Sequence, residues 1–196
     1  MRCQMSQNTN IKALKSGVWY TVGNFINNGI GFLTMPLFNR LLSQNDIGGY
    51  SNFAAWLSIL MIVTTGQLYS TVMVAKFDFK DKINEYIASM LILGSGITLV
   101  FYGFALVFRD AFLKFLGFSE LELHIAFLYS LVFPALNMVQ IKNRIEYKYK
   151  LSVFLTLTST ILSVGVSLVC VILSENKLSG RIAGNYVPLI LYNLFI

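Results

Sequence analysis

The distribution of charge along this chain constrains its fold more than any other feature. Six long segments contain no Asp, Glu, Lys or Arg, and the first five comprise 24, 29, 23, 19 and 24 residues. A helix needs about 20 apolar residues to cross the roughly 30 Å hydrocarbon layer of a bilayer. The segments are 16–39, 47–75, 86–108, 123–141, 151–174 and 182–196. The sequence therefore predicts an integral membrane protein.

The apolar segments predict an all-α membrane helical bundle. Apolar residues make up 56% of the chain, above the roughly 45–50% usual in soluble domains. A transmembrane barrel would instead show strands of about 9–11 residues that alternate apolar and polar positions. We expect one transmembrane domain over 1–196 with about six helices. These lie near 17–38, 50–72, 87–108, 125–141, 151–173 and 181–196, and 109–118 has the mixed charge and aromatic content of an interfacial helix.

The basic residues between the segments predict an orientation. Connections on one side carry ten Lys and Arg residues, and those on the other side carry five. Cytoplasmic loops carry the excess of positive charge, so we predict a cytoplasmic N-terminus. The loop Lys142–Lys150 contributes four of the ten. We favour a topology anchor there over the alternative, a contact for anionic lipid headgroups or a diphosphate.

The residue inventory argues against several function classes. The net charge of +6 is explained by the basic loops, so we expect no nucleic-acid partner. No acidic residue lies inside any of the six segments, and Cys3, Cys170 and His124 do not form a metal-ligand pattern. We therefore expect no catalytic residues, metal or cofactor. The missing carboxylate also disfavours a proton- or cation-driven drug exporter.

Polar residues inside the first segment form the strongest candidate site. Thr21, Asn24, Asn28 and Gly31 follow helical spacing on one face, and Asn27 lies beside them. Three amides exceed what helix packing needs, so we favour a cavity-lining role. Candidates elsewhere are Gln67 and Asn137. For the Ser and Thr stripe of the fifth segment, we favour close helix packing with modest hydrogen bonds.

Several motifs, in order and spacing, carry a resemblance to a known family. Lys15-Ser-Gly-Val-Trp-Tyr-Thr-Val-Gly-Asn-Phe25 and Met35-Pro-Leu-Phe-Asn-Arg-Leu-Leu-Ser-Gln-Asn-Asp-Ile-Gly-Gly-Tyr50 resemble the opening of Wzx-type polysaccharide flippases. These belong to the multidrug/oligosaccharidyl-lipid/polysaccharide exporter superfamily. The basic loop Lys142–Lys150 and the segment Gly180-Arg-Ile-Ala-Gly184 are also similar to the family. The likeness covers nearly the whole chain.

The resemblance implies a carrier that moves undecaprenyl-diphosphate-linked oligosaccharide from the inner to the outer leaflet of a bacterial inner membrane. Such carriers have two lobes of about six helices, so the chain corresponds to the N-terminal lobe. The last segment has 15 residues and stops at Ile196 without a polar flank, and we expect a fragment ending inside the sixth helix. A second lobe or self-association would complete the cavity.

Two basic residues join the candidate site under this interpretation. Lys15, at the inner mouth of the first span, is the better candidate for attracting the diphosphate. Arg40 matches the family arginine after the first helix, although we favour an anchoring role for it at the outer interface. Two alternatives stay open: a non-transporting six-helix interaction module or inactive truncated flippase, and a multidrug exporter of the same superfamily.

Overall fold

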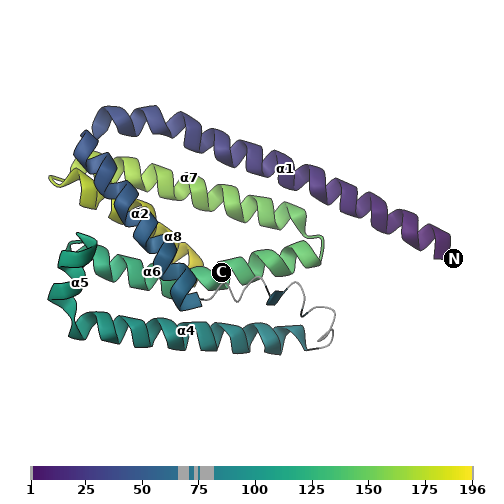
Figure 1. Cartoon of the computed structure of the whole chain (residues 1–196). Helices are drawn as coiled ribbons and strands as arrows, with labels where there is room; N and C mark the ends of the chain where they lie inside the picture. Colours follow the sequence, from purple (N-terminus) through teal and green to yellow (C-terminus); the bar gives the residue numbers. More distant parts are fainter. Residues whose placement is uncertain (1, 66–70, 73–74, 76–81, 196) are drawn as a thin grey trace.

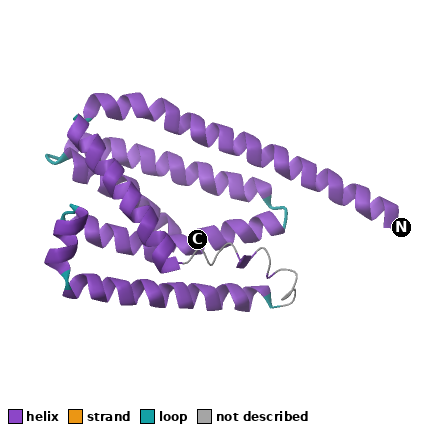
Figure 2. Cartoon of the chain, in the orientation of Figure 1, coloured by secondary structure: helices purple, strands orange, loops and turns teal. Residues whose placement is uncertain are grey.

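The computed structural model describes residues 2–65, 71–72, 75 and 82–195. Seven helices of at least eight residues lie in these ranges, which confirms the all-α prediction (Figures 1 and 2). They are α1 Arg2–Leu41, α2 Gln44–Thr65, α4 Ile83–Val107, α5 Arg109–Leu116, α6 Glu120–Ile145, α7 Tyr149–Leu173 and α8 Lys177–Leu194. The expected helix at 109–118 is α5.

Four of these helices are long and apolar enough to cross a membrane: Gln44–Thr64, Ile83–Val107, Glu120–Arg144 and Tyr149–Leu173. The predicted span 17–38 lies inside α1, where the three asparagines lower the hydropathy. The predicted span 181–196 overlaps α8, which has 18 residues and contains Arg181. The described helices therefore establish a membrane protein, whereas six crossings and a cytoplasmic N-terminus stay predictions.

Helices α1, α4, α6 and α7 run roughly lengthwise in the bundle, and α2 crosses them obliquely (Figure 1). One end, here called the α5 end, contains α5, the last turn of α1 and the first turns of α2, α6 and α8. The opposite end, here called the Arg144 end, contains the short connection from α6 to α7. Helix α1 has 40 residues and extends about 60 Å at 1.5 Å per residue. Its N-terminal part projects beyond the other helices (Figure 1).

Capping residues explain where α5 ends and α6 begins. Gly117 has a φ of 68°, a left-handed conformation that glycine adopts without steric cost. The Asn52 side chain of α2 donates a 3.0 Å hydrogen bond to the Leu116 carbonyl at the end of α5. Ser119 and Glu122 then form a reciprocal capping box at the start of α6. These contacts fix α5 across the end of the bundle.

Close helix contacts depend on small residues. A Cβ added to Gly184 of α8 would lie 2.6 Å from the Ser167 Cα of α7, and one added to Gly180 would lie 2.9 Å from the Cys170 carbonyl oxygen. Such glycines let two membrane helices approach closely. The Ser stripe of α7 is buried at Ser152, Ser159, Ser163 and Ser167. This burial agrees with the packing interpretation of that stripe.

The largest core cluster lies between α2, α6 and α8. It includes Phe53, Ile125, Tyr129, Ile182 and Tyr186, which are at most 9% exposed. The Phe53 and Tyr186 rings are 5.3 Å apart, and those of Tyr129 and Tyr186 are 5.0 Å apart. Tilted and edge-on aromatic pairs at these distances are favourable. Helix α1 lies outside this core and packs mainly on α7.

Candidate functional site

One face of α1 is polar and uncovered by the rest of the chain. Ser16, Gly23 and Phe38 are buried and mark the stripe that packs toward α7. The predicted polar face lies beside this stripe, and all four of its members are exposed: Thr21, Asn24, Asn28 and Gly31. Exposed amides are costly against hydrocarbon. The geometry therefore suits a face that borders a polar cavity.

A small polar pocket adjoins this face at the Arg144 end. Helices α1, α6 and α7 all contribute to it, and its void has a volume of about 20 Å³, enough for one water molecule. Its lining residues are Tyr20, Gly23, Asn24, Arg144, Ser152, Val153 and Thr156. Gly23 brings α1 close to α7 here, since an added Cβ would lie 2.9 Å from the Val153 methyl groups.

The polar groups of this pocket favour an anion. The Arg144 guanidinium carbon lies 5.4 Å from the centroid of the Tyr20 ring, a cation–π arrangement. Arg144 has no carboxylate partner among the residues that the structure describes. The Tyr20 hydroxyl is buried and has no hydrogen-bond partner within the same ranges. A guanidinium and a hydroxyl without partners are the donors that a phosphate oxygen requires.

Neighbouring basic residues at this end are already engaged. The Lys142 ammonium donates a 2.9 Å hydrogen bond to Asn84 Oδ1, which ties α6 to α4. Lys148 forms an ion pair of 2.6 Å with Glu146. Arg144 differs from both lysines because its guanidinium lies over the Tyr20 ring and has no hydrogen bond or ion pair to a side chain in the described part of the chain.

The structure distributes the predicted site residues over several positions. Asn24 lines the pocket, whereas Asn28 is exposed one helical turn further along α1. The Thr160 hydroxyl of α7 donates a 2.6 Å hydrogen bond to Asn27 Oδ1. Asn137 is half-buried on α6 and donates to the Phe133 carbonyl at 3.5 Å. Gln67 lies outside the described residues.

The two predicted basic residues lie at opposite ends of the uncovered polar face. Lys15 is exposed toward the Arg144 end, and Arg40 is exposed in the last turn of α1 at the α5 end. Neither residue lines the polar pocket. Lys15 can therefore contribute long-range attraction for an anion, but the structure does not place it in the pocket.

Sequence reasoning did not single out Tyr20 or Arg144. Arg144 belongs to a loop with several basic residues, and the sequence of that loop does not show which of them has no ion pair in the folded chain. Tyr20 is separated from Asn24 by four positions, so helical spacing placed its hydroxyl near the predicted face. To predict this contact, one would have to know that α1 packs against the end of α6.

A second arginine occupies a very different site at the α5 end. The Arg181 guanidinium carbon is 3.3 Å from the Phe38 ring centroid of α1 and 4.8 Å from the Tyr50 ring centroid of α2. Its Nη1 donates a 2.8 Å hydrogen bond to Ser167 Oγ of α7. Asn185 of α8 donates at 3.0 Å to the Tyr50 hydroxyl. These contacts join four helices through one side chain and its neighbour.

Comparison with known protein families identifies a family for this chain. A family model described as "Polysaccharide biosynthesis protein" matches residues 13–194. The chain belongs to this family. Its members are Wzx-like flippases, which are membrane transporters and not enzymes. Searches of curated proteins and of solved structures gave no match.

Membership of the polysaccharide biosynthesis family confirms the resemblance that the sequence motifs indicated. The match includes α1 from residue 13 onward, the pocket residues and Arg181. In a transporter of this family, an uncovered polar face beside an anion-favouring pocket is a candidate substrate surface. The family match itself does not assign a role to any of these side chains.

Proposed function

We propose that this chain forms one lobe of a flippase for undecaprenyl-diphosphate-linked oligosaccharide in the bacterial plasma membrane. The observation that carries the proposal is the pocket where Arg144, without a described carboxylate partner, lies over Tyr20 and beside Asn24. The void has room for no more than one phosphate oxygen, so the diphosphate would lie outside it, against the exposed Arg144 guanidinium. The Arg144 end then faces the cytoplasm, where the lipid-linked sugar is made available to the carrier.

The remaining polar groups fit the sugar part of such a substrate. Asn24 and Asn28 are exposed along α1, and both amides can donate to and accept from sugar hydroxyls. Lys15 lies near the cytoplasmic mouth and increases the local attraction for the diphosphate. The uncovered face needs an opposing surface, which a second lobe or a second copy of the chain would supply.

Binding of the substrate to the purified chain tests the proposal directly. The chain is reconstituted in lipid nanodiscs and titrated with a fluorescent, short-chain polyprenyl-diphosphate oligosaccharide. We expect saturable binding that Arg144→Ala weakens about 10-fold to 150-fold, the effect of losing roughly 1.5–3 kcal/mol of charge-assisted hydrogen bonding. Arg144→Lys retains the charge and is expected to recover part of the affinity.

Two controls separate this site from general electrostatics. Arg109→Ala removes an exposed arginine that pairs with Glu120 at the α5 end, and it should leave binding unchanged. Polyprenyl monophosphate carries less charge and should bind more weakly than the diphosphate. Equal binding by the Arg144→Ala and Arg109→Ala variants would refute the proposed pocket.

Transport itself is tested in cells that lack their own polysaccharide flippase. The double variant Asn24→Leu, Asn28→Leu should abolish surface polysaccharide while the membrane level of the protein is unchanged. The matched control is the double variant Val22→Leu, Phe25→Leu, at neighbouring apolar positions that are 45% and 79% exposed. Export that survives the double Asn replacement would favour the alternative function, a membrane interaction module in which the polar face only binds another protein.

A further inference from the structure

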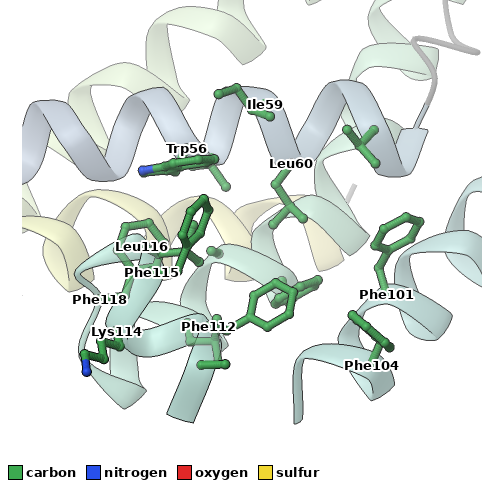
Figure 3. A pocket seen from close by; sticks show the side chains of 16 residues that line it. Trp56, Ile59, Leu60, Phe101, Phe104, Phe112, Lys114, Phe115, Leu116 and Phe118 are labelled. Atoms are coloured by element: carbon green, nitrogen blue, oxygen red, sulfur yellow. The ribbon is translucent and has the colours of Figure 1, made fainter. Parts of the chain in front are cut away.

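An open apolar groove lies between α2 and α4 near the α5 end. Its volume is about 840 Å³, within the roughly 300–1,000 Å³ range of small-molecule sites. Helix α6 contributes Leu123, Ala126 and Phe127, and α5 closes the groove toward the end of the bundle. Trp56 of α2 and Phe115 of α5 are in contact, with ring centroids 5.4 Å apart, and Figure 3 shows Phe101 and Phe104 further along the groove.

The lining of the groove fits a flexible hydrocarbon chain better than another helix. Close packing of membrane helices uses small residues that let the two backbones approach. Here the lining is dominated by large side chains, including Phe101, Phe104, Phe112 and Phe115. On α2 it runs from Trp56 to Val63, roughly 10 Å at 1.5 Å per residue. A thin, deformable ligand can fill the spaces between such rings.

One charged side chain makes the two ends of the groove chemically different. Lys114 of α5 lies at its margin (Figure 3) and is the single charged lining residue. It has no ion pair with a described residue, whereas Arg109 on the same helix is paired with Glu120. Helix α5 has the composition of a helix at a membrane interface. The groove thus combines a cation at the interface with an apolar path leading away from it.

We propose that this groove binds an anionic phospholipid, with its phosphate at Lys114 and one acyl chain between α2 and α4. A single ammonium matches the single negative charge of a phosphodiester headgroup such as that of phosphatidylglycerol. A diphosphate would require more positive charge than the margin of the groove provides. The site is separate from the Arg144 pocket, at the other end of the bundle, and does not depend on the proposed transport function.

Fluorescence quenching of Trp56 tests the site, because this ring lines the groove. The chain has two tryptophans, so Trp19→Phe leaves Trp56 as the reporter. The protein is reconstituted in vesicles containing acyl-brominated phosphatidylglycerol or acyl-brominated phosphatidylcholine at equal mole fraction. We expect an apparent preference of about fivefold for phosphatidylglycerol, the effect of one lysine near an anionic headgroup.

Variants distinguish a site from ordinary lipid contact. Lys114→Ala should remove the preference, Lys114→Arg should keep it, and Lys150→Ala at the opposite end should leave it unchanged. Ala111→Phe fills part of the groove from an exposed position on α5, so quenching by both lipids should fall. Circular dichroism and elution volume confirm that each variant is folded.

Three results would overturn the assignment. Equal quenching by the two lipids would show a non-selective annular contact. No quenching by either lipid would show that protein, such as another copy of the chain, covers the groove. Relief of quenching by equimolar polyprenyl diphosphate, in the presence of excess phosphatidylglycerol, would identify the transported lipid as the occupant.

Discussion

Two arginines at opposite ends of the bundle both lie over aromatic rings, yet their surroundings differ completely. Arg181 is half-buried and contacts Phe38, Tyr50 and Ser167, which come from three other helices. Arg144 is exposed, lies over Tyr20 alone, and borders a void with unengaged polar groups. A guanidinium whose partners all come from the protein serves the fold. One with few protein partners is available to a ligand.

The packing around each arginine extends this difference. At the α5 end, Phe38 and Leu42 pack with Val171, so α1 is held against α7 by a buried cluster. At the Arg144 end, Trp19 stacks on Tyr149 at 6.1 Å, but Asn24 and Lys15 stay exposed. We therefore expect replacements at the α5 end to reduce stability and replacements at the Arg144 end to reduce binding.

The largest effect is expected for Gly184→Ala, which acts on the framework that positions Arg181. The new methyl group would lie 2.6 Å from the Ser167 Cα, so α7 and α8 would have to separate. Overpacking of this kind costs about 1–3 kcal/mol and occasionally more. The thermal midpoint in detergent should fall clearly. Gly165→Ala, where nothing lies within 4 Å, is the matched control and should be neutral or slightly stabilising.

Arg181→Met is expected to give the next largest loss. It removes a charge-assisted hydrogen bond to Ser167 and cation–π contacts with Phe38 and Tyr50, while keeping part of the apolar volume. We expect a destabilisation of about 2 kcal/mol, measured by thermal unfolding in detergent. Arg181→Lys should recover only part of it, because an ammonium cannot stack as a planar guanidinium does. An unchanged midpoint would show that Arg181 is free for another role.

Arg144→Ala should reduce substrate binding and leave thermal stability unchanged. An exposed side chain without a described ion pair contributes within about 0.5 kcal/mol of stability, so the thermal midpoint should be unchanged. Binding of polyprenyl-diphosphate oligosaccharide should still fall as described above. If Arg144→Ala lowers the midpoint as much as Arg181→Met, the two ends do not differ in function and the comparison fails.

Much of the fold follows from charge spacing alone. Charges are expensive in hydrocarbon, so their absence over about 20 residues predicts a helix wherever it occurs. The expectation at 87–108 corresponds to Ile83–Val107, and that at 151–173 corresponds to Tyr149–Leu173. Helix α6 begins at Glu120 and not near 125, because the Ser119 and Glu122 capping box starts the helix in polar sequence. Helices α4 and α7 begin at Ile83 and Tyr149 without a side-chain cap.

The candidate site was only partly predictable. Helical spacing placed Asn24 and Asn28 on one face, which is a local property of the sequence. The contact of Tyr20 with Arg144 joins residues far apart in the chain, and it depends on how α1 packs against α6 and α7. The structural role of Arg181, in contrast to the binding role proposed for Arg144, likewise depends on aromatic rings that other helices supply. Charge patterns do not encode these pairings.

The smallest effect, and one of opposite sign, is expected for Tyr20→Phe. The Tyr20 hydroxyl is buried without a hydrogen-bond partner in the described ranges, so its removal relieves a desolvation cost of up to about 1 kcal/mol. The ring stays in place for Arg144, and the thermal midpoint should be unchanged or raised while oligosaccharide binding weakens a few-fold.

Tyr192→Phe is the matched control, because the Tyr192 hydroxyl donates at 3.2 Å to the Leu155 carbonyl and lies 3.0 Å from Thr158 Oγ1. That variant should lower the midpoint. Equal losses for both variants would mean that a bound water satisfies the Tyr20 hydroxyl, and the Arg144 end would then be as fully engaged as the α5 end.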